Sequence, residues 1–321
     1  MKAPAYSEIK NFRGFFMQRV RKQVGVTEEM NTMLSGRPVS IAVLDSGIAK
    51  HPDLMENILA FRDFINDKQE IYDDLGHGTH VSGIIAGDGK CLRGMYRGMA
   101  PLSRLIVGKI LNHKGEGETT NILKALDWIE QVRTKYDIRI LNLSAGLSDS
   151  GEESKQILMQ QRIDRLWDKG IVVVCAAGNN GPEDDSISAI GTRSQAIVVG
   201  CHDEEYCKNR KGKCEDYSGR GRKESLFRKP DLVAPGTEII SCNAFYENKY
   251  NGKRQYYVAK SGTSMAAPIV SGAIALALQA EPELNPNTLR TRLLRSTRDL
   301  GEAWNKQGYG MLDCKKMLGN L

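Results

Sequence analysis

Apolar and polar positions along the chain predict an alternation of buried strands and helices. Four short apolar runs rich in β-branched residues predict strands at residues 39–44, 138–144, 171–177 and 195–200. The apolar residues are consecutive in these runs, which is typical of strands that are covered on both faces in a parallel sheet.

Two segments between these runs have their apolar residues at helical spacing. Residues 120–136 predict a helix with one apolar face, made of Ile122, Leu126, Ile129 and Val132. Residues 157–167 predict another before Gly170, a typical helix stop, with the apolar residues Ile157, Leu158, Ile163, Leu166 and Trp167. The alternation predicts an α/β fold, with a doubly wound, mostly parallel sheet and helices on both faces. Because no repeat or linker divides the chain, we expect one domain over residues 17–321 after a short extension, residues 1–16.

Polar residues follow three of the predicted strands. Asp45, Ser144 and Asn179 stand where their apolar runs end. Since the carboxyl ends of parallel strands meet at one edge of a sheet, we expect these three residues to converge on one crevice.

Composition and charge exclude several classes of protein. The net charge of +6 over 321 residues is mild and does not indicate nucleic acid or a membrane surface as a partner. The longest apolar stretch, residues 266–280, is interrupted by Pro268, Ser271 and Gly272, and is shorter than the about 20 apolar residues of a membrane span. The N-terminal region lacks the apolar core of about 7–15 residues that a signal peptide needs. We therefore expect a cytoplasmic protein.

The seven cysteines are an odd number without paired short spacings, which predicts free thiols. Alternatively, Cys201, His202, Cys207 and Cys214 could hold zinc or close a disulfide, although their spacing matches no usual metal-ligand pattern. Residues 207–229 carry nine Lys or Arg against three acids and predict a solvated loop. A single aromatic residue before Phe227 offers little surface for stacking bases, so an acidic partner or nucleic acid is the less favoured reading.

Candidate catalytic residues stand in glycine-rich segments that precede apolar helices. His77 and His80 lie in residues 73–87, and Ser264 lies in SGTSMAAP, residues 261–268. A serine hydroxyl is a weak nucleophile, so it needs a neutral imidazole to take its proton and a buried carboxylate to orient that imidazole. Asp45, His77 and Ser264 can supply these three roles. Asn179 and the backbone N–H of Ser264, at a predicted helix start, could stabilise the oxyanion that develops.

Five segments, in this order, resemble the signature blocks of the subtilisin-like serine proteases, the subtilases. The blocks are AVLDSGI (42–48), HGTHVSG (77–83), AAGNNG (176–181), KPDLVAPG (229–236) and SGTSMAAP (261–268). The resemblance extends over nearly the whole chain and implies a subtilisin-like fold. It implies that Asp45 orients His77, that His77 is the general base and acid, that Ser264 is the nucleophile and that Asn179 is the oxyanion donor. It assigns His80 a structural position.

The resemblance also implies a substrate-binding cleft. Ser144, Ala145 and Gly146 match the segment that pairs with an extended substrate backbone. Ala176, Ala177 and Gly178 would line one wall of the primary specificity pocket, with Ser188 near its floor. Small residues there suggest a pocket with room for a large apolar or aromatic side chain.

Three departures from the family pattern qualify this picture. Ala145, Gly146 and Leu147 stand where Leu-Gly-Gly is common, so one wall of the cleft is altered. Asp53 matches a residue that ligates calcium in many subtilases, but the loop at residues 86–101 lacks the asparagines that complete that site. No cofactor is needed for the chemistry. The sequence leaves open whether a calcium ion stabilises the fold. Residues 1–38 are too few for a folded prodomain, so the chain resembles the intracellular subtilisins most. Residues 1–16 are then either an inhibitory zymogen segment or a disordered or surface-packed tail.

The sequence therefore predicts a serine endopeptidase that acts on unfolded or flexible polypeptides through an acyl-enzyme on Ser264. One alternative is a peptide-binding protein that keeps the fold without the activity. Another is a hydrolase of small esters or amides. The sequence gives no oligomeric state.

Overall fold

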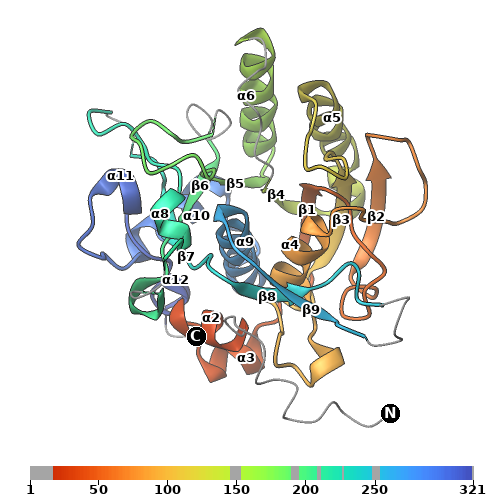
Figure 1. Cartoon of the computed structure of the whole chain (residues 1–321), viewed down its shortest axis with the longest axis horizontal. Coiled ribbons are helices and arrows are strands. Elements are labelled where there is room, and N and C mark those ends of the chain that lie inside the picture. The colour runs from red at the N-terminus through yellow and green to blue at the C-terminus, as the bar shows by residue number, and fades with distance from the viewer. Residues whose placement is uncertain are drawn as a thin grey trace.

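Seven strands form a central parallel sheet in the order β2-β3-β1-β4-β5-β6-β7 (Figure 1). The strands are β1 (Ser40–Asp45), β2 (Ile58–Asp63), β3 (Arg104–Lys109), β4 (Ile138–Leu143), β5 (Val172–Ala176), β6 (Ile197–Cys201) and β7 (Leu232–Ala234). A separate antiparallel pair joins β8 (Ile239–Cys242) to β9 (Tyr257–Lys260). The structure is a computed structural model that describes residues 17–144, 153–188, 195–207, 211–225, 228–247 and 254–319.

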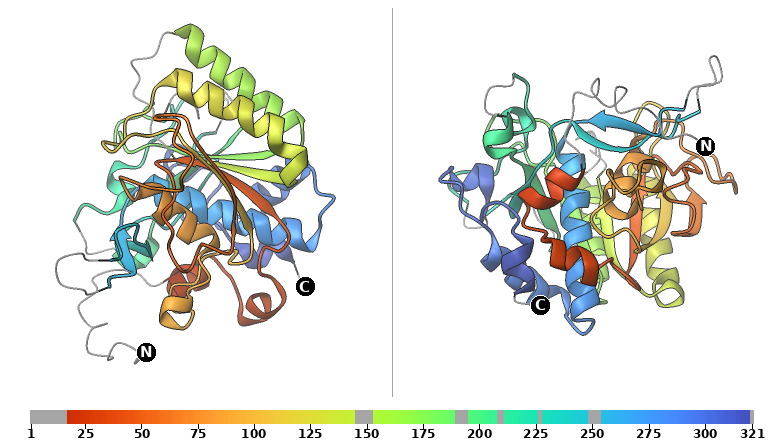
Figure 2. Two further views of the ribbon diagram at one scale, coloured as in Figure 1. Left: turned by 90° about the vertical axis from the view of Figure 1, so that its right-hand side faces the viewer. Right: turned by 90° about the horizontal axis from the view of Figure 1, so that it is seen from below.

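Helices cover both faces of the sheet, as the left view of Figure 2 shows. α5 (Thr119–Tyr136) and α6 (Glu153–Asp168) lie side by side on one face, and α4 (His77–Ala86) and α9 (Thr263–Ala280) lie on the other. The core is therefore divided by the sheet into two large clusters of buried apolar side chains. The fold is the predicted doubly wound α/β domain.

Shorter elements complete the chain. They are α2 (Met17–Gln23), α3 (Glu28–Met33), η1 (Lys90–Leu92), η2 (Glu204–Cys207), α8 (Cys214–Tyr217), α10 (Pro286–Ser296), α11 (Trp304–Gln307) and α12 (Cys314–Leu318). The start of α10 follows the usual rules for a helix N-terminus, since the side chain of Asn285 accepts a hydrogen bond from the Thr288 N–H and Pro286 takes the first position.

The four predicted strands are confirmed within one or two residues as β1, β4, β5 and β6. The sequence pattern did not single out β2, β3 or β7. The predicted face of α5 is also confirmed, with Val132 only partly buried.

The predicted face of α6 is wrong at two positions. Ile157 and Leu158 are each 42% exposed, whereas Met159, Ile163, Leu166 and Trp167 are buried. The buried residues recur at spacings of four, three and one, which defines one helical face, and residues 157 and 158 lie to the side of it.

One described helix, α9, is long and apolar enough to cross a membrane, but 83% of its 18-residue window is buried inside the protein. It acts as the central helix of the core. Residues 1–16, with their expected inhibitory role, lie outside the described residues.

Candidate active site

The candidate catalytic side chains converge at the carboxyl edge of the sheet. Asp45 is the last residue of β1, and His77 is the first residue of α4. The His77 Nδ1 atom lies 2.6 Å from the Asp45 Oδ1 atom. Asp45 is fully buried, while the side chain of His77 is 22% exposed, so the imidazole can reach a substrate and its orienting carboxylate cannot.

The environment of His77 favours its protonated form. Burial acts to lower its pKa, but the charge of Asp45 and the hydrogen bond to it outweigh burial, so the pKa of His77 is raised above its usual value. The geometry therefore allows Asp45 to orient the ring and to stabilise its protonated form.

A network of polar side chains fixes the turn that carries His77. Asp73 accepts a hydrogen bond from the Ser46 hydroxyl at 2.8 Å and from the backbone N–H of Gly76 at 2.7 Å. Its other oxygen accepts from the Thr79 N–H and hydroxyl. The Ser46 hydroxyl in turn accepts from the Gly78 N–H at 2.9 Å. Asp73 thus connects the residue after Asp45 with the backbone on both sides of His77.

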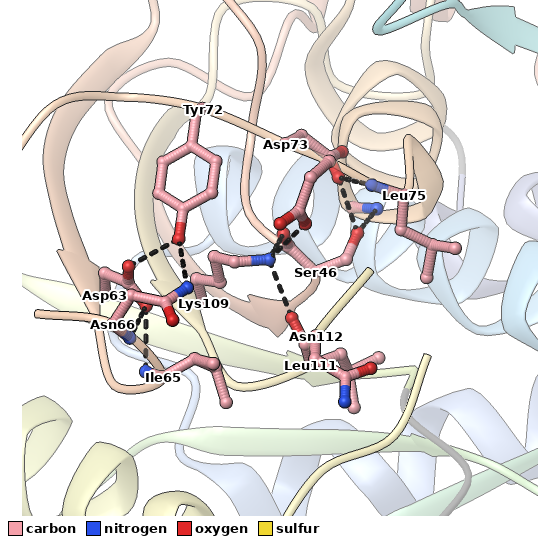
Figure 3. A network of polar contacts seen from close by, with 12 residues as sticks. Ser46, Asp63, Ile65, Asn66, Tyr72, Asp73, Leu75, Lys109, Leu111 and Asn112 are labelled. Atoms are coloured by element: carbon pink, nitrogen blue, oxygen red, sulfur yellow. Dashed lines mark hydrogen bonds and ion pairs between the residues drawn. The ribbon is translucent and has the colours of Figure 1, made fainter. Parts of the chain in front are cut away.

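Lys109 extends this network beneath the site (Figure 3). It pairs with Asp45 in the register of β1 and β3, and its side chain is fully buried. Its amine donates to the Ser46 carbonyl, to the Leu111 carbonyl and to Asp74, at 2.6–2.7 Å. Beside Lys109, the Tyr72 hydroxyl donates a hydrogen bond to Asp63 at 2.5 Å.

Sequence reasoning missed this supporting layer. Asp73 and Asp74 directly precede the LGHGTH segment, and Lys109 ends the apolar run RLIVGK. A charged residue at the end of a buried strand was the available signal, since a buried amine needs several acceptors.

Two N–H donors lie around Gly262, the residue before α9. The side-chain oxygen of Asn179 accepts from the Thr263 N–H at 3.0 Å, so its amide nitrogen is turned away from that contact. A Cβ added at Gly262 would lie 3.3 Å from the Asn179 Nδ2 atom and 3.8 Å from the Ser264 backbone nitrogen. Gly262 also has a φ of 145°, which favours glycine. The glycine therefore leaves open the space that both donors border.

The hydroxyl of Ser264 donates to the carbonyl of Ser144 at 2.8 Å. Among the described residues, no hydrogen bond joins Ser264 to His77. α9 begins at Thr263, one residue before the predicted start, so the Ser264 N–H still belongs to the first helical turn. The buried Ser144 lies directly after β4, while Ala145 and Gly146 of the predicted substrate segment lie outside the described residues.

The predicted pocket residues lie together, with Ala176 as the last residue of β5 and the others after it. Ser188 donates through its backbone N–H to the Ala177 carbonyl at 2.9 Å and through its hydroxyl to the Ala176 carbonyl at 3.2 Å. A Cβ at Gly178 would lie 3.4 Å from the Cβ atom of Ser188. Ala176, Ala177, Gly178 and Ser188 therefore form one small-residue wall next to Asn179.

Among the described residues, the groups around Asp53 do not fit a calcium ion. The two oxygens of Asp53 accept from the Tyr257 hydroxyl at 2.5 Å and from the Cys91 N–H at 3.0 Å. The other potential ligand atoms that lie within 4.8 Å of Asp53 belong to the His51 imidazole and the Cys242 thiol. Calcium takes six to eight oxygen ligands, so this set of donors does not fit it.

The cysteine cluster considered from the sequence is partly brought together. Cys201 and Cys214 are buried free thiols whose sulfurs would lie 2.6 and 3.1 Å from a Cβ on Gly236. His202 Nδ1 accepts instead from the Glu204 N–H at 3.0 Å, and nothing is described of the Cys207 side chain. Among the described residues, these side chains form no metal-ligand group.

The described part of the basic loop carries several ion pairs. Lys213 contacts Glu215, Arg222 contacts Asp185 and Lys223 contacts Asp184. Much of its positive charge is therefore balanced within the chain.

Comparison with known proteins places the chain in a family. Residues 36–311 match the sequence profile of the Subtilase family. The chain is 37% identical over 281 residues to the serine protease AprX of Bacillus subtilis (strain 168), covering 82% of this chain and 62% of AprX. It is 34% identical over 295 residues to an intracellular serine protease of Paenibacillus polymyxa, covering 86% and 79% of the two chains.

A solved structure titled "S41 Psychrophilic Protease" has a TM-score of 0.72 with this chain. It is 29% identical, and the match covers 87% of this chain and 92% of the other. The present chain spans less than two thirds of the length of AprX. The family match nevertheless covers most of the present chain, and the chain belongs to the subtilase family of serine proteases.

Proposed function

We propose that this protein is a serine endopeptidase in which Ser264 forms an acyl-enzyme with the substrate. The 2.6 Å contact between His77 Nδ1 and Asp45 carries the proposal, because it directs the other ring nitrogen of His77 away from the carboxylate and leaves it to act as the base. Ser264 attacks the peptide carbonyl, His77 takes the hydroxyl proton, and His77 then gives that proton to the leaving amine. Water hydrolyses the ester in the second half of the reaction.

The oxyanion forms in the space beside Gly262. The Asn179 amide and the Ser264 N–H border this space and can donate to a negatively charged oxygen. Before attack, the Ser264 hydroxyl has to turn from the Ser144 carbonyl toward His77. This is a rotation of one side-chain bond, and we assign it to substrate binding.

The proposed substrate class rests on the family resemblance of two segments. A polypeptide in extended form would pair with residues 144–146, and its side chain at the cleaved bond would enter the pocket beside Ala176 to Gly178. The small residues of that wall support a preference for large apolar or aromatic side chains.

We propose further that the chain functions inside the cell, as the intracellular subtilisins do. Two observations support this: 34% identity to a protein named as an intracellular serine protease, and six described cysteines that are all free thiols. Free buried thiols are typical of reducing compartments.

A serine-directed fluorophosphonate tests the activity. We expect one adduct on Ser264, located by mass spectrometry and absent from Ser264→Ala. Ser261→Ala, three residues upstream on the same segment, is the matched control and should label fully. Labelling the full chain and a form without residues 1–16 tests the inhibitory role of that segment. No adduct in either form would favour the peptide-binding alternative. Cleavage of small esters without cleavage of long peptides would favour a small-molecule hydrolase.

A further inference from the structure

Two buried carboxylates, Asp63 and Asp73, lie in the segment that leads from β2 to α4 (Figure 3). Asp63 ends β2 and is 2% exposed, while Asp73 lies four residues before His77 and is 7% exposed. Neither takes part in the proposed bond-breaking reaction. A buried carboxylate needs hydrogen-bond donors to replace its lost hydration, so the donors around each one show which part of the chain it holds.

Asp63 binds donors of the loop that follows it. It accepts hydrogen bonds from the backbone N–H groups of Ile65, Asn66 and Lys68 at 2.8–3.3 Å and from the Tyr72 hydroxyl at 2.5 Å. These contacts hold the loop and do not reach the start of α4.

Asp73 binds donors on both sides of the proposed catalytic pair. It accepts five hydrogen bonds at 2.6–3.2 Å, from the Ser46 hydroxyl, the backbone N–H groups of Leu75, Gly76 and Thr79, and the Thr79 hydroxyl. The residue after Asp45 and the backbone around His77 are therefore fixed to one carboxylate.

Ser46 connects this carboxylate to the catalytic pair. Its backbone N–H donates at 2.7 Å to Asp45 Oδ1, the same oxygen that His77 Nδ1 contacts at 2.6 Å. Its hydroxyl donates to Asp73 at 2.8 Å and accepts from the Gly78 N–H at 2.9 Å. The contact between His77 and Asp45 is thus one side of a closed ring that passes through Ser46 and Asp73.

The start of α4 is packed directly against the loop after β1. A Cβ added at Gly78 would lie 2.2 Å from the Gly47 carbonyl oxygen and 3.1 Å from the Asp45 Cβ atom. Because the two backbones are in contact, a shift of either one changes the position of His77 relative to Asp45.

Titratable groups from several elements act on His77. Burial lowers its pKa, Asp45 on β1 raises it, Lys260 on β9 lowers it, and Asp73 raises it. His80, one turn further along α4, has a pKa of about 3 and stays neutral. The charge of Asp73 therefore acts in the same direction as that of Asp45.

We propose that Asp73 is a positioning residue for the pair of His77 and Asp45. Asp73 does not touch the reacting atoms. It holds Ser46 and the start of α4 so that His77 Nδ1 stays on Asp45 and the other ring nitrogen remains available for proton transfer. The kinetic consequence rests on the proposed peptidase function, whereas the state of the His77 ring can be measured without it.

Asp73→Asn keeps the size of the side chain but removes its charge and one acceptor, so it cannot hold all five donors. On a peptide without ionisable side chains, kcat should fall by about 100-fold, the cost of a displacement of about 1 Å, while KM stays unchanged. The acid limb of kcat/KM should move to lower pH. Asp63→Asn is the matched control, because it should lower the melting temperature without changing kcat or the acid limb.

The inactive Ser264→Ala protein gives a test that does not depend on peptidase activity. NMR titration of labelled histidine rings, assigned with His77→Ala, should show a lower pKa of His77 after Asp73→Asn and the parent value after Asp63→Asn. Absence of cleavage by the parent would refute the proposed function, and the NMR titration would still decide the role of Asp73.

Ser46→Ala is used if Asp73→Asn does not fold. This variant opens the ring but keeps the charge of Asp73, so kcat should fall while the acid limb stays in place. Three results would overturn the proposal: the parent kcat in folded Asp73→Asn or Ser46→Ala, an unchanged pKa of His77 in Asp73→Asn, or an equal loss of kcat in Asp63→Asn.

Discussion

His77 and His80 lie one turn apart on α4, but their surroundings give them opposite properties. His77 is partly exposed and pairs with Asp45, which together with its hydrogen bond raises the pKa of His77 despite burial. His80 is fully buried, and its Nε2 atom lies 3.0 Å from the carbonyls of Ile239 and Val258. Burial, with the charges of Lys260 and His77, lowers the pKa of His80 to about 3.

The comparison shows that a carboxylate and access to solvent, more than position on a helix, distinguish a base from a structural residue. His80 can only donate to carbonyls and stays neutral, so it connects α4 to β8 and β9. The pKa of His77 is raised, and its partly exposed ring can exchange a proton with a bound substrate. Mutation of His77 should therefore change mainly activity, and mutation of His80 should change mainly stability.

The largest effect is expected from His77→Ala. This variant should lose about 10⁶-fold in kcat, a magnitude known for the catalytic histidine of subtilisin, a relative of this chain. At a pH above the raised pKa of His77, where the charge pair with Asp45 no longer contributes stability, its melting temperature should stay close to that of the parent. Initial rates on a long peptide and calorimetry of the same sample check both parts. A parallel loss of stability would contradict the separation of roles.

Asp45→Asn should lower kcat by about 10⁴-fold, as removal of the orienting carboxylate does in serine proteases generally. Without the negative charge, burial dominates and the pKa of His77 falls, so the acid limb of the kcat/KM profile should move to lower pH. The limb is measured on a peptide substrate without ionisable side chains.

The same pair predicts a pH dependence of stability. Because the pKa of His77 is raised in the folded state, its contribution is fully present below the ordinary value of about 6.5 and is lost as pH rises through the raised value. Asp45→Asn should therefore reduce the free energy of unfolding more at about pH 5 than at about pH 9. Denaturant titrations in the Ser264→Ala background would contradict this if the two losses were equal.

His80→Gln should affect stability and not the chemistry. The pKa of His80 is lowered from 6.5 to about 3 in the folded state. Neutral His80 therefore contributes about 5 kcal/mol to the free energy of unfolding above pH 6.5, and this contribution is lost as the pH falls from about 6.5 to about 3. Glutamine does not titrate, so the variant should lose less folding stability in acid than the parent. At neutral pH the variant should be about 1–3 kcal/mol less stable, because two carbonyls lose part of their partner. Equal acid slopes for both proteins would show that His80 is not the group responsible.

The sequence predicted the parts of this molecule that depend on local patterns. Consecutive β-branched residues located β1, β4, β5 and β6, whereas the catalytic roles of Asp45, His77 and Ser264 stay predictions. Edge strand β2 was missed although it begins with the apolar run ILAF, and all its residues but Asp63 are exposed or half-buried. Ile157 and Leu158 were assigned to the wrong face of α6.

Contacts between distant segments could not be predicted in the same way. Tyr257 meets Asp53 from 204 positions away, and the Lys109 amine finds its acceptors in two other loops. Such contacts depend on how the loops cross in space, and a single sequence carries no local periodicity for them. The hydrogen bond from Ser264 to Ser144 belongs to the same class.

The smallest effect is expected from Lys260, the last residue of β9, whose charge lowers the pKa of both histidines. It is half-buried between Val258, which contacts His80, and Gly262, which borders the oxyanion space. Lys260→Gln should raise both pKa values. The acid limb of kcat/KM should therefore move slightly to higher pH, while rates on the alkaline plateau stay unchanged because His77 is already neutral there. Lys124→Gln, on the exposed side of α5, is the matched control and should leave the profile in place. The same substitution should also reduce the loss of folding stability in acid, because it raises the pKa of His80. A shift of the pH–activity profile without a change in the pH dependence of stability would show that the charge of Lys260 affects only one of the two histidines.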